Sequence, residues 1–193
     1  MSTPELRPGV CWRVFPWDAE APPGARFSPS HIPPTTGRGR FDLPRDLSPV
    51  LYLAQTESHA VGEMLQAWRG QRIRKAHLTR AGFPLALVEV HIPPASARRL
   101  ADLCDPAHLA GSGIPPDVTA SRSRELTQPI ARAAWDAGHH GLRWWSSFWG
   151  DWHTVVLFTR RLGGRLRFGE PEVLTEAHPA VVEAAHLLGM TPG

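Results

Sequence analysis

Residues 37–63 bring three charged or polar-tipped side chains into one short stretch of the chain. Arg40 lies in a loop rich in glycine and arginine, Tyr52 in the apolar run VLYLA, and Glu63 in the first turns of a helical pattern. A guanidinium binds phosphate oxygens in pairs, so Arg40 suits a phosphate-bearing ligand. Taken singly, the three residues are typical of a surface charge, a core aromatic and a solvated carboxylate. Their combination makes this stretch the first candidate for a functional site.

The hydrophobic pattern predicts the elements that position these side chains. Residues 10–15 (VCWRVF) and 50–54 (VLYLA) are typical of strands. Thr56 or Ser58 can cap a helix that runs to about Trp68. Its apolar stripe consists of Ala60, Val61, Met64, Leu65 and Trp68. Glu63 falls about 60° outside this stripe, at roughly 100° per residue, so we expect it at the border of the buried face.

The rest of the chain mixes strands and helices without a regular alternation. We expect strands over 84–92, 142–146 and 154–158, and helices over 128–137, capped by Thr127, and 179–188. Residues 16–49 and 111–117 are expected to be loop, and 100–104 a short helix or strand. This order predicts an α+β fold with a mixed sheet rather than a doubly wound one.

Composition places the chain among globular proteins. Its 193 residues are 42% hydrophobic and 20% charged, which suits one domain with a substantial core. No apolar run is long enough to span a bilayer, and no leader pattern opens the chain, so we expect a soluble cytoplasmic protein without membrane contact. The two cysteines, Cys11 and Cys104, imply no disulfide framework.

The basic balance is modest and is made almost wholly of arginine. The formal net charge is +3, and Lys75 is the single lysine among 21 basic residues. Such a charge spread over the whole chain does not favour direct nucleic-acid binding. The sequence does not determine the oligomeric state, and a homo-oligomer remains possible.

Other constellations are better explained by structure than by chemistry. His139 and His140 are adjacent and no zinc-binding spacing occurs, so no metal site is expected. A hydrolase triad of Asp151, His153 and Ser146 or Ser147 lacks the GxSxG elbow. The tryptophans at 144, 145, 149 and 152 could stack on bases, but core packing fits them better. The run GRG at 37–39 lacks the strand and the Lys-Ser/Thr pair of a phosphate loop.

Five short motifs occur in a fixed order along the chain: GRFD (39–42), VLYLA (50–54), AVGEM (60–64), TQ-x₂-A (127–131) and GLRWWS (141–146). Each motif alone is weak, but the ordered set resembles the RES domain family, which is named for an Arg, a Glu and a Ser spread along the chain. Matched residue by residue, the positions of the family's motifs fall on Arg40, Tyr52, Glu63 and Ser146.

The resemblance covers about residues 10–160. The opening CWRVF is similar to the family's first strand and places Arg13 where the family has a second basic residue. The family often has proline before its serine, where this chain has Trp145, so Ser147 competes with Ser146 for that role. Residues 16–38 and the extension over 161–193 are matched less clearly.

The resemblance implies a single RES-like domain with a fold similar to that of ADP-ribosyltransferases and a cleft for NAD. It implies a bacterial toxin that cleaves the nicotinamide–ribose bond and passes ADP-ribose to water or phosphate, as NAD glycohydrolases and NAD phosphorylases do. Glu63 would stabilise the positive charge on the ribose, Arg40 would hold pyrophosphate or ribose, and Ser146 would fix the pose. Tyr52 would stack on the nicotinamide ring, with Arg13 and Ser147 as further binding residues.

The resemblance also implies partners and leaves alternatives. NAD would be a substrate, with no prosthetic group and no metal. An Xre-type antitoxin protein with a DUF2384 domain is the expected partner. Two other functions remain open: ADP-ribosyl transfer to a protein or nucleotide, and a non-enzymatic basic module that binds nucleic acid.

Overall fold

The computed structural model describes residues 9–146 and 152–191. The chain divides into two compact units. The first consists of Met1–His31, Ala54–His91 and Arg167–Gly193, and the second of Ile32–Leu53 and Ile92–Leu166. Among the described residues, none of the helices has both the length and the apolar character that crossing a membrane requires.

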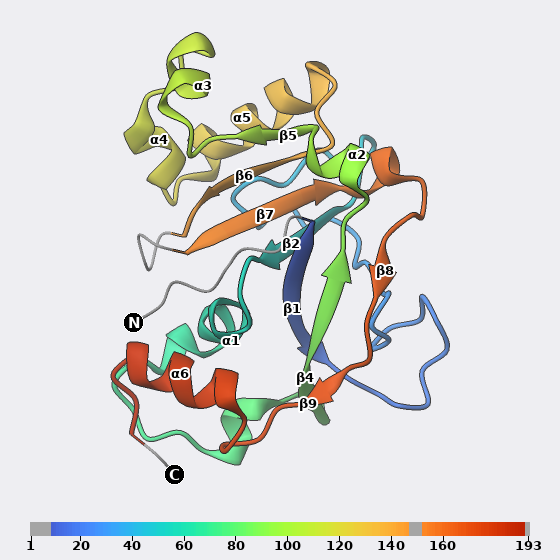
Figure 1. The fold of residues 1–193 in the computed structure, drawn as a ribbon, viewed down its shortest axis with the longest axis vertical. Coiled ribbons are helices and arrows are strands. Elements are labelled where there is room, and N and C mark those ends of the chain that lie inside the picture. Colours follow the sequence, from blue (N-terminus) through green and yellow to red (C-terminus); the bar gives the residue numbers. More distant parts are fainter. Residues whose placement is uncertain (1–8, 147–151, 192–193) are drawn as a thin grey trace. The chain divides into compact units, whose positions relative to one another are not determined.

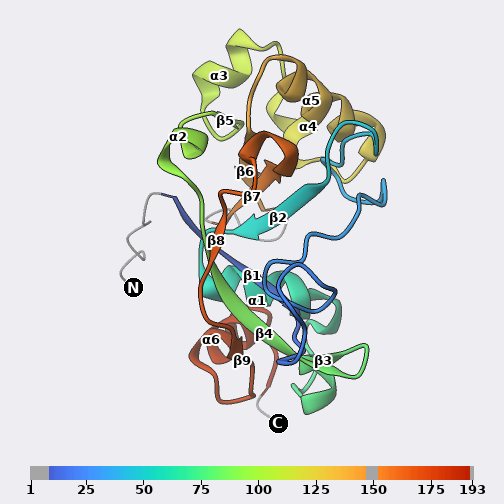
Figure 2. The same ribbon diagram turned by 90° about the vertical axis from the view of Figure 1, so that its right-hand side faces the viewer.

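The first unit is built around one long antiparallel strand pair (Figures 1 and 2). β1 (Val10–Pro16) pairs with β4 (Phe83–His91) over its whole length. Three two-residue strands line the other edge of β4: β3 (Thr79–Arg80), β8 (Arg167–Phe168) and β9 (Glu172–Val173). β4 is buried at Leu85–Val88, and Leu85 and Leu87 belong to the hydrophobic cluster of this unit.

Two helices form the core of this unit. α1 (Glu57–Leu65) and α6 (Pro179–Leu187) pack together, and Val61, Leu65 and Val181 are fully buried where they meet strand residues. The short helical turns η1 (Gln66–Trp68) and η2 (Lys75–Leu78) follow α1. The Thr56 side chain accepts a hydrogen bond from the His59 N–H, so the predicted cap is confirmed at Thr56.

The second unit carries a mixed sheet. β6 (Gly141–Trp145) pairs antiparallel with β7 (His153–Phe158) and parallel with β5 (Leu100–Asp102). β2 (Val50–Ala54), whose first four residues belong to this unit, lies beside β7. The remaining elements are α2 (Pro94–Ala97), α3 (Pro106–Gly111), α4 (Pro116–Ala120), α5 (Arg124–Asp136) and η3 (Thr159–Leu162). The predicted α+β class with a mixed sheet is therefore confirmed.

Two predictions about helices were wrong. α5 begins at Arg124 and not at residue 128, because its N-cap is Ser123. The Thr127 hydroxyl donates instead to the carbonyls of Ser123 and Arg40, and Pro129 lies inside the helix. Residues 111–117 are not all loop, because α4 starts at Pro116. α2, α3 and α4 each have proline in the first turn and only four to six residues, too few for a periodic pattern to show.

We expect a single RES-like domain with a core over 10–160 and an extension over 161–193. The division into two compact units does not test this expectation, which stays a prediction. The extension contributes β8, β9 and α6 to the first unit.

Both cysteines are free thiols, and burial raises the pKa of the Cys104 thiol to about 12. Cys104 is therefore a poor nucleophile at neutral pH.

A substitution at Gly141, the first residue of β6, measures how tightly the second unit is packed. A Cβ at this position would lie 2.0 Å from the Val156 carbonyl oxygen and 3.1 Å from the Leu157 Cα, both backbone atoms. We expect Gly141→Ala to lower the free energy of unfolding by about 3 kcal/mol, because strand backbone must move to admit the methyl group. Urea denaturation measures the loss.

Gly111→Ala is the matched control, because nothing lies within 4 Å of the Cβ that it would add. Gly111 ends α3, so this substitution should change the free energy of unfolding by no more than about 1 kcal/mol. Equal losses in the two variants would contradict the assigned β6–β7 register.

Candidate functional site

The loop that carries Arg40 is held by a chain of hydrogen bonds around Tyr52. The Tyr52 hydroxyl donates to Asp42 Oδ1 at 2.9 Å and accepts the Phe41 N–H at 3.0 Å. Asp42 Oδ2 accepts the Gly39 N–H at 3.0 Å. Burial and the neighbouring Asp42 carboxylate raise the pKa of Tyr52, so its hydroxyl stays protonated and remains a donor. Strand β2 thus fixes the loop through one side chain.

Gly39 is required for this arrangement. A Cβ at Gly39 would lie 2.3 Å from both Asp42 Oδ1 and the Tyr52 hydroxyl oxygen. Only glycine allows the loop backbone to approach the Tyr52–Asp42 pair so closely. The glycine of the GRFD motif therefore has a steric role, and it is not part of a phosphate loop.

The Arg40 guanidinium is placed over aromatic rings. Its central carbon lies 5.3 Å from the Phe41 ring centroid and 5.9 Å from that of Trp144, and Nη2 donates to the Thr119 carbonyl at 2.5 Å. Tyr52 meets Trp144 edge to face, with ring centroids 6.2 Å apart. The structure therefore brings two predicted site residues, Arg40 and Tyr52, to one aromatic cluster of the second unit.

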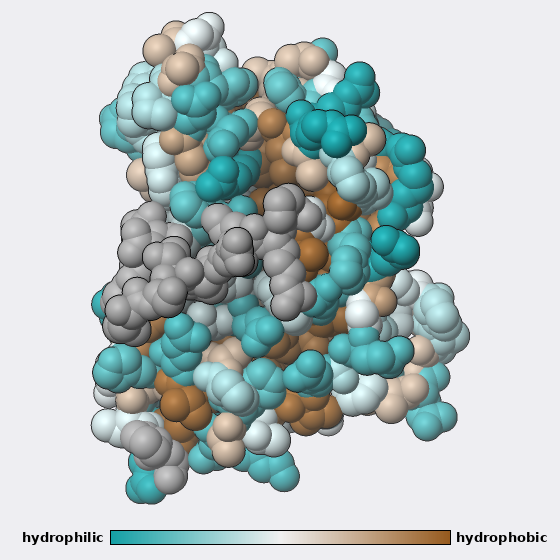
Figure 3. All heavy atoms as spheres, viewed as in Figure 1, coloured by the Kyte–Doolittle hydropathy of each residue, from teal (hydrophilic) through white to brown (hydrophobic). Residues whose placement is uncertain are grey.

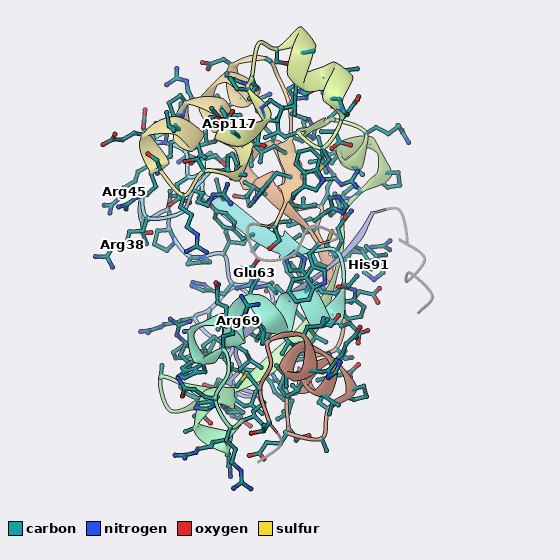
Figure 4. The ribbon with its side chains drawn as sticks, turned by 90° about the vertical axis from the view of Figure 1, so that its left-hand side faces the viewer. Arg38, Arg45, Glu63, Arg69, His91 and Asp117 are labelled. Atoms are coloured by element: carbon teal, nitrogen blue, oxygen red, sulfur yellow. The ribbon has the colours of Figure 1, made fainter. Side chains whose placement is uncertain are left out.

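α5 holds the same loop from another side. Gln128 Nε2 donates to the carbonyls of Gly37 and Gly39 at 3.1 and 3.0 Å, and the Thr127 hydroxyl donates to the Arg40 carbonyl. The TQ motif therefore supports the Arg40 loop, about 90 residues away in sequence. Arg38 and Arg45 extend outward from the loop and do not take part in these bonds (Figure 4).

Glu63 lies on α1 in the first unit, where its side chain is 33% exposed (Figure 4). Its Oε1 is 3.2 Å from Nε2 of His59, a fully buried residue one turn earlier. Gln66 Nε2 donates to Glu63 Oε2 at 3.2 Å and to the Glu63 carbonyl at 2.9 Å. A carboxylate held on both oxygens yet partly exposed has a fixed direction, which electrostatic catalysis requires. The predicted place at the border of the buried face is confirmed.

Arg13 belongs to the first unit, and its side chain binds the loop over residues 29–31. Nη1 donates to the carbonyls of Pro29 and His31 at 3.3 and 2.8 Å, and the guanidinium lies over the Phe15 ring. Burial lowers the pKa of Arg13 to about 10, so it is still a cation at neutral pH. These contacts assign Arg13 a role in holding residues 29–31; its predicted role toward a ligand stays a prediction.

Ser146 follows β6 in the second unit and is 7% exposed, and its N–H donates to the Trp152 carbonyl at 2.6 Å. Ser147, its rival, lies outside the described residues, as do Trp149 and Asp151. Trp144 and Trp152 are buried, so the core interpretation is confirmed for these two, and Trp145 is partly buried against the same core.

The adjacent histidines lie in the turn between α5 and β6. His140 lies in this loop and is 9% exposed, and its Nδ1 lies 3.1 Å from the Ser96 hydroxyl. Burial and the nearby Arg99 lower its pKa. Within residues 9–146 and 152–191, no three His, Cys, Asp or Glu side chains gather as metal ligands would.

Sequence reasoning missed three residues around the candidate site: Asp42, His59 and Gln128. Each had a readable signal, because Asp42 ends GRFD, His59 precedes Glu63 by one helical turn, and Gln128 belongs to the TQ motif. These three residues orient Arg40 and Glu63. That role depends on three-dimensional contacts, which residue type alone does not reveal.

Comparison with known proteins places the chain in a family. The RES domain model matches residues 10–175, most of the chain and fifteen residues beyond the end of the resemblance read from motifs. The chain therefore belongs to the RES domain family. No curated protein matches it.

A solved structure shares the fold: the MbcT–MbcA toxin–antitoxin complex of M. tuberculosis. The likeness has a TM-score of 0.58 at 19% sequence identity and covers 93% of this chain and 88% of the other.

The Tyr52–Asp42 hydrogen bond can be tested by a double-mutant cycle. Tyr52→Phe removes the hydroxyl and Asp42→Asn removes the charge, and we expect each to lower the free energy of unfolding by about 1–3 kcal/mol, because both leave buried partners unsatisfied. Since the residues are in contact, the double variant should lose about 1–2 kcal/mol less than the sum. Additive losses, measured by chemical denaturation, would show that the bond does not hold the loop.

Proposed function

We propose that this RES domain protein is an NAD-consuming enzyme that cleaves the nicotinamide–ribose bond. The observation that carries the proposal is the Glu63 carboxylate, partly exposed and held by His59 and Gln66 on a helix of the family's motif. The C1′–N bond breaks, its electron pair stays on nicotinamide, and the ribose gains positive charge. A water or phosphate oxygen then attacks C1′ and loses its proton, giving ADP-ribose or its 1″-phosphate.

The role proposed for Glu63 is electrostatic. A carboxylate near C1′ stabilises the oxocarbenium-like transition state more than the neutral ribose of the ground state, so it accelerates the reaction. The bond to His59 keeps Oε1 from rotating, and Gln66 does the same for Oε2. Removal of a comparable electrostatic group typically costs about 10²–10³ in rate.

The roles proposed in the second unit are those of binding. Arg40, fixed through Thr119 and the aromatic rings, would bind a phosphate or ribose oxygen of NAD. Ser146 would hydrogen-bond the carboxamide or a ribose hydroxyl. Tyr52 uses its hydroxyl to hold the Arg40 loop, so only its ring would serve the nicotinamide.

Glu63→Gln tests the proposal directly. We expect nicotinamide release from NAD to fall about 10²–10³-fold, because the amide keeps the shape and loses the charge. Thermal unfolding should change little, since Glu63 is partly exposed. Nicotinamide is measured by chromatography, with and without phosphate, and phosphate dependence assigns phosphorolysis in place of hydrolysis.

Glu183→Gln is the matched control, because Glu183 is an exposed carboxylate on α6, in the same unit. It should release nicotinamide at the rate of the unmodified protein. Equal loss in both variants, or no release by a folded unmodified protein from which any bound partner has been removed, would overturn the proposal.

The acceptor distinguishes this reaction from ADP-ribosyl transfer. NAD labelled in its adenylate moiety should yield label only in small products if water or phosphate accepts ADP-ribose. Label on protein or on an added nucleotide would assign the chain as an ADP-ribosyltransferase.

The cellular role proposed is that of a toxin restrained by an antitoxin. The similar fold was solved in a toxin–antitoxin complex, and family membership supports the same arrangement here, with an Xre-type antitoxin carrying a DUF2384 domain. Expression of the chain alone should stop growth, Glu63→Gln should not, and co-expression of a neighbouring antitoxin should restore growth. Harmless expression of a folded, active protein would contradict this role.

A further inference from the structure

Residues 69–80 form an exposed segment with a single sign of charge. Six of its twelve residues are basic, and no Asp or Glu occurs between Glu63 and Glu89. The basic residues are Arg69, Arg72, Arg74, Lys75, His77 and Arg80. All except His77 are exposed, whereas Ile73 and Leu78 between them are buried. We call these residues the basic segment.

The backbone of the basic segment is fixed at several points. The Ile73 N–H donates to the Thr191 carbonyl at 2.9 Å and the Gly70 N–H to the Leu188 carbonyl at 3.1 Å, so the segment follows the chain beyond α6 (Figure 1). The His77 ring stacks on Trp68 with centroids 4.9 Å apart. The backbone that carries the cations is therefore held in place, which lowers the entropy lost when a ligand binds.

The turn after β3 fixes the end of the segment. Ala81 and Gly82 both have positive φ, 54° and 85°, as in the two-residue hairpin turns that match strand twist. β3 pairs with β4 through Arg80↔Phe83, so Arg80 stands on a strand (Figure 2). An alanine in this conformation is uncommon, and the turn is held by the strands on either side.

Four of the five exposed cations are not neutralised by a carboxylate within the described chain. No ion pair in residues 9–146 and 152–191 joins a carboxylate to Arg69, Arg74, Lys75 or Arg80. Three carboxylates of the same unit, Glu63, Glu89 and Glu172, each lie within 3.5 Å of a histidine instead. The segment therefore keeps a concentrated positive potential for a partner.

The chemistry of the segment favours a phosphate backbone over a protein partner. Protein interfaces usually have an apolar core, but the large exposed hydrophobic residues of the described chain, Leu126, Val173 and Val182, all lie outside it. On the face drawn in Figure 3, hydrophobic side chains of the first unit show only as small separate patches. Spaced guanidinium groups on a fixed backbone are what contacts to successive phosphates require.

We propose that the basic segment is a sequence-independent binding site for the phosphate backbone of duplex DNA. This proposal goes beyond the proposed NAD chemistry and does not depend on it, because no residue of the basic segment belongs to the candidate site. The formal net charge of +3 underestimates this site, since five exposed cations lie within twelve residues. Such binding would hold the protein on the chromosome without selecting a sequence.

Fluorescence anisotropy of a labelled duplex of arbitrary sequence, about 20 base pairs long, tests the site across about 50–300 mM salt. The test variant changes Arg69, Lys75 and Arg80 to glutamine, three exposed residues whose side chains form no ion pair with another described residue. The control changes three exposed arginines of the second unit, Arg45, Arg98 and Arg124, to glutamine, with the same loss of charge.

We expect the unmodified protein to bind with a steep salt dependence. The test variant should lose at least about tenfold in affinity at 100 mM salt, and its slope of log K against log salt should flatten by about 2–3. The control should lose less than about threefold. Circular dichroism and the thermal midpoint verify that all three proteins are folded, and nicotinamide release by the test variant reports separately on the NAD chemistry.

Three outcomes would overturn the proposal. The first is the absence of binding at about 50 mM salt, and the second is an equal loss in both variants, which would show general attraction without a site. The third is competition by polyglutamate as strong as that by unlabelled duplex at equal charge, which would assign the segment to an acidic protein partner.

Discussion

The close approach of Gly39 to the Tyr52–Asp42 pair is the constraint on which the Arg40 loop depends. Loop backbone normally lies at the surface and moves, yet here its N–H groups at Gly39 and Phe41 are bound to one carboxylate and one phenol. A hydrogen bond to a charged group contributes about 1.5–3 kcal/mol, and the Tyr52–Asp42 bond belongs to this class. Since Tyr52 lies on a strand, the rigidity of the sheet is passed to the loop and to the guanidinium that follows Gly39.

Glu63 is held by the same physical means on a different element. A helix places residues one turn apart on the same face, so His59 reaches the Glu63 carboxylate without any distant segment. His59 is fully buried, whereas Glu63 is one-third exposed, so the imidazole ties the carboxylate to the core. Arg40 and Glu63, the two charged residues predicted for the site, are thus each fixed through polar contacts with a buried anchor, a fixation that preorganised electrostatic sites need.

The sequence predicted the elements that carry these side chains better than the contacts that orient them. The apolar run VLYLA and the capped helix after it both formed, although α1 ends at Leu65 and residues 66–68 form the separate turn η1. The prediction that Thr127 is an N-cap was wrong. A threonine before an apolar pattern is typical of an N-cap, but this hydroxyl donates a hydrogen bond to the Arg40 carbonyl. That bond joins residues 87 apart, and no local pattern could reveal it. The short helices α2, α3 and α4 were missed because proline-initiated turns of four to six residues leave no period.

The joint occurrence of the motifs has a physical explanation in these contacts. The GRFD loop needs Tyr52 from the next strand and also Thr127 and Gln128 from a helix far along the chain. A change in any one of these residues would leave a partly buried donor or acceptor without its partner, a loss that a distant substitution cannot compensate. The GRFD, VLYLA and TQ motifs must therefore occur together, because they are parts of one hydrogen-bonded structure. This is why the ordered set identified the family although each motif alone is weak, and why TQ marks support for a charged residue and not chemistry of its own.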